Sequence, residues 1–360
     1  MNEDEAEAVR SLLDPLLRAL EMLLFVSRNL HPPDFEELMA SVGTPDEELK
    51  SALARPLQWP QHPPDIGTLL GAACDAALGA FAGLRKTLQQ SSDVRDVYRA
   101  LRLLPKGLEA LYPLAAILPP VNRFFLDPSL RSDDAVQARF LGAPAQNDTG
   151  VMQFGEKERG GFWLYVPENY VPDRAWPLVM ALHGGSGSGR QFLWSWLRDA
   201  RSRGAIVVAP TSVGSTWALM GPDTDTPNLR RILEMVRSRW NVDATRLLLT
   251  GMSDGGTFSY VSGLEAASPF THLAPVSAAF HPMLAQVAEA DRLRGLPIHI
   301  IHGALDWMFP VELAQQAHRL LSRAGAAVTF REVEDLSHCY PRELNGALLN
   351  WLETTPSAPA

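Results

Sequence analysis

The sequence predicts an α/β protein in which an all-helical N-terminal domain precedes a mostly parallel, doubly wound sheet. Up to about Phe140 every strong pattern is helical, with apolar residues recurring three and four positions apart. Beyond residue 150, short apolar runs alternate with helical segments, as in βαβ units. We therefore expect a helical domain over residues 1–140, a linker over 141–150 and an α/β domain over 151–360.

The first helix is predicted by one apolar stripe, in which Asp14-Pro15 is expected to introduce a kink or a restart. The stripe comprises Val9, Leu13, Leu16, Leu20, Leu23 and Leu24. The Ala- and Gly-rich residues 67–90 predict a closely packed helix, and further helices are expected from Ser92 to about Leu104 and from Pro105 to about Pro119. The most apolar stretch, residues 69–84, contains Asp75 and is expected to be too short to span a bilayer.

Two short helices in this half are predicted from their first residues. Asp34 with Glu37, and Thr44 with Glu47, have the spacing of capping boxes. Pro45 then stands at the first helical position, where its missing N–H costs nothing.

The second half predicts strands and helices in alternation. A hairpin is expected from residues 151–155 and 162–166, which flank Gly160-Gly161. Buried parallel strands are expected at 178–182, 205–209, 246–250, 272–276 and 297–301, and a last strand at 328–333. Helices are expected at 228–240, 255–266 and 341–352.

Composition excludes several classes of partner. The formal net charge is −9, which argues against nucleic acid or an anionic membrane surface as the main partner. Two distant cysteines, Cys74 and Cys339, do not form a disulfide framework and fit a reducing compartment. The acidic start is unlike a signal peptide, so we expect a cytoplasmic protein without a membrane span.

Ser253 is the candidate nucleophile. It lies in Gly251-Met252-Ser253-Asp254-Gly255, between an apolar run and a helical segment. A Ser hydroxyl becomes a useful nucleophile when a sharp strand-to-helix turn exposes it to a base, and the flanking glycines are expected where the turn leaves no room for a Cβ.

A glycine-rich loop follows the predicted strand 178–182. In enzymes with such a turn, this loop supplies one backbone N–H to the oxyanion hole and the residue after the nucleophile supplies the other, here Gly185 and Asp254. The loop does not match the dinucleotide-binding motif Gly-x-Gly-x-x-Gly, because Arg190 occupies the position of the third glycine. The alternative is that this loop is a turn without a part in an oxyanion hole.

Asp306 and His338 complete the candidate catalytic group. Asp306 follows the strand 297–301, and His338 lies between the last strand and the last helix, so the chain order is Ser, Asp, His. Asp306 could instead cap the next helix, and His338 could be a solvated surface residue. Asp335 is the competing acid, because it is close to His338 in sequence; Asp306 is preferred because it ends its own strand.

These motifs resemble those of α/β-hydrolases of the phospholipase/carboxylesterase group, and of the related feruloyl esterases and polyhydroxybutyrate-depolymerase-like esterases. The resemblance covers residues 151–352 and rests on segments 177–184, 241–246 leading into 251–256, 302–306 with Pro310, and 337–338. It implies a serine esterase with Ser253 as nucleophile, His338 as general base and acid, Asp306 as its orienter, and no cofactor. A carboxylate at Asp254 and the long helical half depart from the family pattern.

The expected substrate is a small-molecule ester with a short or medium acyl chain or an aryl group. Aromatic residues at the expected carboxyl ends of strands are candidates for the binding pocket. They are Phe192, Trp194, Trp196, Trp217 and Trp307. Alternatively, each of these side chains covers the edge of the hydrophobic core and binds no substrate.

Other functions remain open at this point. A serine peptidase or amidase would use the same three residues, whereas a non-catalytic binding protein is disfavoured because all three are present. The histidines do not have the i, i+4 spacing of a helical metal site. The helical half is expected either to cap the site or to mediate assembly into a homo-oligomer.

Overall fold

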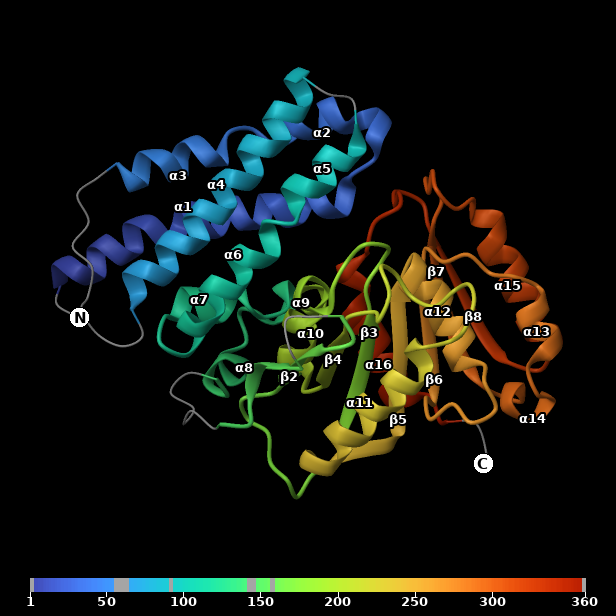
Figure 1. Ribbon diagram of the computed structural model, residues 1–360. Helices are drawn as coiled ribbons and strands as arrows, with labels where there is room; N and C mark the ends of the chain where they lie inside the picture. The colour runs from blue at the N-terminus through green and yellow to red at the C-terminus, as the bar shows by residue number, and fades with distance from the viewer. Residues whose placement is uncertain (1–2, 55–64, 91–92, 141–146, 156–158, 358–360) are drawn as a thin grey trace. The chain divides into compact units, whose positions relative to one another are not determined.

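The computed structural model describes residues 3–54, 65–90, 93–140, 147–155 and 159–357. The chain divides into two compact units, Met1–Pro144 and Ala145–Ala360. Most of the linker predicted over 141–150 lies outside the described residues. Each unit is described below by itself (Figure 1).

The first unit is helical throughout its described residues. Its first helix continues through Pro15 without the predicted restart, because buried leucines hold it on both sides of the proline; Leu12 and Leu16 are fully buried. The α-helices are α1 (Glu3–Asn29), α2 (Phe35–Val42), α3 (Pro45–Leu53), α4 (Ile66–Gln90), α5 (Val94–Leu101), α6 (Leu104–Leu111), α7 (Pro119–Phe124) and α8 (Asp134–Ala138).

The predicted capping boxes are wrong, although the helix starts are close to those expected. Asp34 and Thr44 occupy the N-cap positions of α2 and α3, but neither side chain makes a capping hydrogen bond. The Asp34 carboxylate instead contacts His31 Nδ1 at 2.8 Å, and Glu47 pairs with Lys50 Nζ at 2.7 Å. The Asp34 and Glu47 carboxylates therefore bind nearby side chains in place of the backbone N–H groups that a capping box would bind.

Helix α4 corrects the expectation that its apolar stretch is too short to span a bilayer. It has 25 residues and, within the described part of the chain, is the one helix that is long and apolar enough to cross a membrane. A core helix meets the same criteria, and α4 packs against α1, α5 and α6. Ala73, Ala77 and Phe81 are fully buried there, and a Cβ on Gly83 would lie 2.7 Å from Ala100 Cβ of α5.

The second unit is an eight-stranded sheet in the order β1-β2-β4-β3-β5-β6-β7-β8. β1 and β2 form an antiparallel hairpin, β2 is antiparallel to β4, and the remaining pairs are parallel, as the sequence predicted. The strands are β1 (Gly150–Phe154), β2 (Phe162–Val166), β3 (Trp176–Leu182), β4 (Ile206–Pro210), β5 (Val242–Met252), β6 (His272–Val276), β7 (Pro297–Gly303) and β8 (Ala327–Val333).

Helices cover both faces of this sheet, with α12 in front and α16 behind in the view of Figure 1. Every residue of β3, β4 and β6 is buried, which explains their unbroken apolar sequences. The helices are α9 (Gly189–Phe192), α10 (Leu197–Arg203), α11 (Asp225–Arg239), α12 (Asp254–Gly263), α13 (Met283–Val287), α14 (Ala290–Leu293), α15 (Val311–Arg323) and α16 (Asn345–Thr354).

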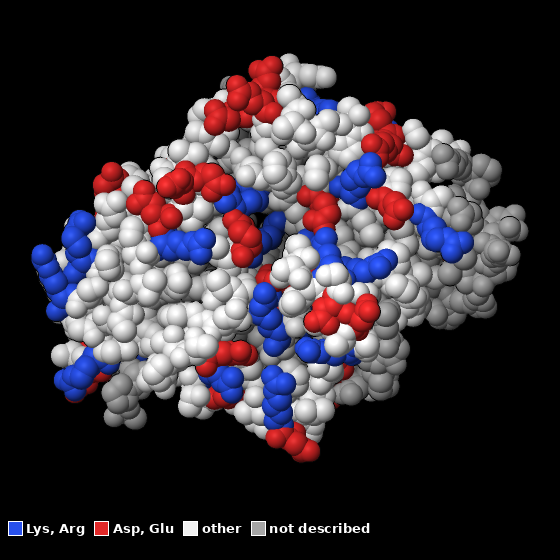
Figure 2. Space-filling view, turned by 180° about the vertical axis from the view of Figure 1, so that it is seen from behind, with Lys and Arg blue, Asp and Glu red and all other residues white. Residues whose placement is uncertain are grey.

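The charged surface mixes both signs. Figure 2 shows Lys and Arg side chains interspersed with Asp and Glu over the face that it presents. Ion pairs at the surface include Arg18–Glu48 at 2.9 Å and Arg230–Glu265 at 2.5 Å.

Gly255 allows α12 to begin against the end of β3. A Cβ on Gly255 would lie 2.4 Å from the carbonyl oxygen of Leu182 and 2.5 Å from that of His183. Both contacts are with backbone and cannot be relieved by rotating a side chain. The last glycine of the Gly-x-Ser-x-Gly motif is therefore required by close packing.

We predict that Gly255→Ala lowers the free energy of unfolding by about 1–3 kcal/mol, because the added methyl must push β3 and α12 apart. Urea denaturation measures the change. Gly71→Ala in α4 is the matched control, since a Cβ there has no neighbour within 4 Å. It should be neutral or slightly stabilising. Equal behaviour of the two variants would refute the packing argument.

Two histidines, the buried His272 and the half-buried His299, pack against Trp351 of α16. The ring centroids of His272 and His299 lie 5.0 and 5.4 Å from that of Trp351. His272 Nε2–H donates to the Thr355 carbonyl at 3.1 Å. Burial lowers the pKa of His272, and burial together with the charge of Arg331 lowers that of His299 to about 4.

We predict that the protein loses stability as pH falls from about 6.5 to about 4. In that window the unfolded chain protonates His299, whereas the folded chain does not, and the difference reaches about 3 kcal/mol for this residue. His299→Gln should flatten the dependence of unfolding free energy on pH, measured by urea denaturation across the window. His281→Gln, at an exposed site, is the control. An unchanged slope in His299→Gln would contradict the prediction.

Candidate active site

Ser253 lies at the turn between β5 and α12. Its backbone has φ 56° and ψ −119°, a conformation that residues other than glycine rarely adopt. The Ser253 N–H donates to the Val276 carbonyl at the end of β6, at 2.9 Å. The strained turn is thus held by the neighbouring strand, and it presents the hydroxyl at the carboxyl edge of the sheet.

The structure brings His338 to this hydroxyl. His338 follows β8, and its Nε2 lies 3.0 Å from Ser253 Oγ. Its Nδ1 lies 2.8 Å from Asp306 Oδ2 and 3.0 Å from Oδ1. With Nδ1–H donating to the carboxylate, Nε2 is free to accept from the Ser hydroxyl.

Asp306 lies just beyond β7, where the sequence placed it. Its Oδ1 also accepts the N–H groups of Met308 at 3.0 Å and Phe309 at 2.9 Å, so the carboxylate shapes its own turn as well as holding His338. It does not cap α15, whose N-cap is Pro310. The competing acid, Asp335, is exposed.

The environment of Asp306 favours its ionised form. Burial opposes ionisation, but the hydrogen bond and charge of His338 and the N–H of Phe309 outweigh it, so the pKa of Asp306 is lowered. A second histidine, His302, lies 3.5 Å away through its Nε2, which donates to the Phe309 carbonyl at 2.8 Å. Burial lowers the pKa of His302, which keeps that ring neutral near pH 7.

The glycine-rich loop after β3 lies beside Ser253. A Cβ on Gly184 would be 3.6 Å from Ser253 Cβ, and one on Gly185 would be 2.9 Å from Asp254 Oδ2. The loop is therefore adjacent to the turn, as expected for Gly185 and Asp254. The Asp254 carboxylate accepts a hydrogen bond from the Thr216 hydroxyl at 2.6 Å.

His183 anchors this loop, a role that the sequence analysis missed. Its Nδ1–H donates to the Gly184 carbonyl at 2.7 Å, and its Nε2 accepts the Ser212 N–H at 3.1 Å. Burial lowers the pKa of His183 to about 4, so the ring stays neutral and keeps both bonds. Only its place at the end of strand β3 could have singled it out in sequence.

The expected aromatic pocket needs correction. Phe192, Trp194 and Trp217 are all buried, at 8%, 5% and 2% exposure. Trp217 Nε1–H donates to the His183 carbonyl at 2.7 Å, and its ring stacks on Phe258 of α12. These side chains support the loops, and Trp196 is fully buried as well. Of the five, Trp307 is accessible, at 43% exposure.

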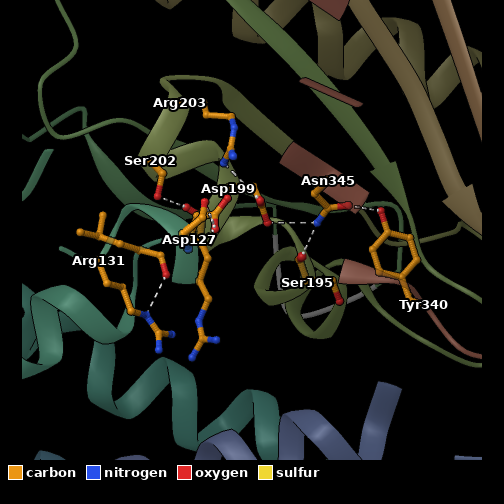
Figure 3. Close-up of polar contacts among 11 residues, drawn as sticks. Asp127, Arg131, Ser195, Asp199, Ser202, Arg203, Tyr340 and Asn345 are labelled. Carbon is orange, nitrogen blue, oxygen red and sulfur yellow. Dashed lines mark hydrogen bonds and ion pairs between the residues drawn. The ribbon is translucent and has the colours of Figure 1, made fainter. Parts of the chain in front are cut away.

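The segment after His338 is tied to two helices (Figure 3). The Tyr340 hydroxyl donates to Asn345 Oδ1 at 2.8 Å, and Asn345 Nδ2–H donates to the Ser195 carbonyl at 2.7 Å. Tyr340 also makes an edge contact with Phe192. This buried network fixes the chain two residues beyond the imidazole.

The described residues contain no group of three or more His, Cys, Asp or Glu side chains that could hold a metal ion. Cys74 and Cys339 are both buried, and neither is in a disulfide within the described residues. Burial raises the pKa of Cys74 to about 12, so it remains protonated.

Residues 226–355 match the family model of phospholipases and carboxylesterases. The chain is 32% identical over 147 residues to a bifunctional acetylxylan esterase/xylanase of Neocallimastix patriciarum, with 40% of this chain and 21% of that protein covered. It is 28% identical over 156 residues to a probable feruloyl esterase C of Aspergillus terreus, with 41% and 56% covered. The chain thus spans between a fifth and just over half of the length of these relatives.

Solved structures similar to the chain include a thermostable esterase, with TM-score 0.48, 22% identity, and coverage of 57% of this chain and 62% of that one. A ferulic acid esterase from Anaeromyces mucronatus has TM-score 0.44 and 15% identity, with coverage of 59% and 93%. The strand order and the strand-to-helix turn at Ser253 are consistent with the family match over residues 226–355. The second unit therefore has a mostly parallel α/β sheet, and its residues 226–355 are similar to phospholipases and carboxylesterases.

Proposed function

We propose that the chain is a serine carboxylic-ester hydrolase that acts through an acyl-enzyme. The proposal rests on the continuous series of hydrogen bonds from Asp306 through His338 to Ser253, with spacings of 2.8 and 3.0 Å. A carboxylate, an imidazole and a hydroxyl in this order have the geometry of a catalytic triad. The family match to carboxylesterases supports the same reaction class.

In this mechanism Ser253 Oγ attacks the ester carbonyl carbon while His338 Nε2 accepts the hydroxyl proton. The C–O bond to the alcohol then breaks, and His338 returns the proton to the leaving oxygen. Water repeats the sequence on the acyl-enzyme, which releases the acid and restores the hydroxyl. Asp306 holds the imidazole tautomer and stabilises the imidazolium that forms.

The backbone N–H groups of Gly185 and Asp254 are proposed as donors to the oxyanion. Their support is the position of the Gly184-Gly185 loop beside Ser253 and its anchoring through His183. In other enzymes, the loss of one such donor costs about 3–4 kcal/mol of transition-state stabilisation.

The proposed substrates are esters of short or aryl acyl groups. Leu305, Trp307 and Met308 flank Asp306 and are exposed by 42%, 43% and 46%, so an apolar surface adjoins the site. The relatives named acetylxylan esterase and feruloyl esterase support an acetyl or an aromatic acyl group in the substrate. Comparing ester with amide substrates tests the peptidase or amidase alternative.

We predict that Ser253→Ala lowers kcat on 4-nitrophenyl acetate by roughly 10⁴- to 10⁶-fold without unfolding the protein, as expected for loss of a triad nucleophile. Stopped or continuous absorbance assays measure turnover, and circular dichroism monitors the fold. Ser238→Ala, on an exposed serine of α11, is the control. A fluorophosphonate should label Ser253 in the wild type; turnover in Ser253→Ala near that of the wild type would refute the proposal.

We also predict that kcat/KM rises from acid to neutral pH, because His338 must be neutral to accept the Ser253 proton. The lowered pKa of Asp306 keeps its carboxylate ionised through this range, so that it can hold the imidazole. Asp306→Asn should lower kcat by roughly 10⁴-fold, since it no longer selects the reactive tautomer. A flat pH profile in the wild type would contradict this mechanism.

A further inference from the structure

The acyl-transfer mechanism leaves the carboxylate of Asp254 unexplained. Asp254 directly follows the nucleophile, and its Oδ2 lies so close to Gly185 that a Cβ there would be 2.9 Å away. The side chain thus lies beside the two amides that are proposed to receive the oxyanion. A negative charge at this point opposes the charge that develops in the reaction.

Thr216 contacts the same oxygen. The Thr216 hydroxyl donates to Asp254 Oδ2 at 2.6 Å. Because Thr216 belongs to the loop after β4, this bond joins that loop to the first residue of α12. It fixes where the carboxylate lies.

The loop that carries Thr216 is itself firmly held. Asp225 accepts the N–H of Val213 at 2.7 Å through Oδ1 and that of Ala218 at 2.8 Å through Oδ2, so one fully buried carboxylate spans the loop. Trp217 is buried between His183, at 4.8 Å, and Phe258, at 5.5 Å between ring centroids. The Thr216 hydroxyl is therefore presented from a rigid support.

A carboxylate without this bond has an alternative partner close by. Backbone N–H groups that are arranged to bind an oxyanion also bind other anions. A freely rotating Asp254 side chain could accept a hydrogen bond from the Gly185 N–H and occupy the place of the substrate oxygen.

We propose that the Thr216–Asp254 hydrogen bond is a positioning contact that fixes the Asp254 carboxylate in one orientation, in which Oδ2 accepts from the Thr216 hydroxyl and does not compete for the Gly185 N–H proposed to bind the oxyanion. The inference rests on the proposed esterase function and assigns Thr216 as a positioning residue for it. It also gives the carboxylate after the nucleophile a defined place.

The test is a double-mutant cycle in the full chain, with 4-nitrophenyl acetate as substrate. Thr216→Val should lower kcat roughly tenfold or more while KM stays within about twofold, because the loss falls on the transition state. In the Asp254→Asn background the same change should cost less than about threefold, since the neutral amide does not compete as an anion. Thr216→Ser keeps the hydroxyl and should recover most of the loss.

Thr245→Val is the matched control. Thr245 Oγ1 donates to Asp243 Oδ1 at 2.7 Å in an exposed Thr–Asp pair at the start of β5, so its loss removes a similar bond outside the site. Its kcat should equal that of the wild type. Equal losses from Thr216→Val in both backgrounds, or no loss in either, would overturn the positioning role alone. An inactive wild type with unlabelled Ser253 would overturn the esterase function as well.

Discussion

The candidate site depends on one packing constraint: the first turn of α12 lies directly against the end of β3. At Gly255 no side-chain atom fits between the helix and the Leu182 carbonyl. Next to this close approach, Ser253 has a positive φ and the glycine-rich loop lies beside it. The candidate nucleophile and its proposed oxyanion donors therefore lie around the same contact.

Parallel strands then bring distant residues together. β5, β7 and β8 end at one edge of the sheet, so the segments that follow them can carry Ser253, Asp306 and His338 to a common point. Asp306 and His338 are separated by 32 residues in sequence, and His338 and Ser253 by 85. Hydrogen bonds to Met308, Phe309 and Asn345 hold the connecting loops in place.

A shell of neutral, buried polar groups surrounds the reactive ones. His183 and His302 both have lowered pKa values through burial, and each directs its ring N–H toward a backbone carbonyl. Such groups orient their neighbours without adding charge to the site. The Asp254 carboxylate also lies beside this site, and the hydroxyl of Thr216 accounts for its placement.

The sequence by itself determined the α/β class and the order of strands and helices along the chain, and it predicted the three candidate residues that the structure brings into contact, because apolar periodicity and the Gly-x-Ser-x-Gly turn are local signals. It misjudged the caps at Asp34 and Thr44, where nearby side chains compete for the same bonds. The burial of Trp217 and the anchoring roles of His183 and Thr216 were decided only by the tertiary structure. Their partners come from other strands and loops, and no local pattern records which groups a folded sheet will bring within hydrogen-bond distance.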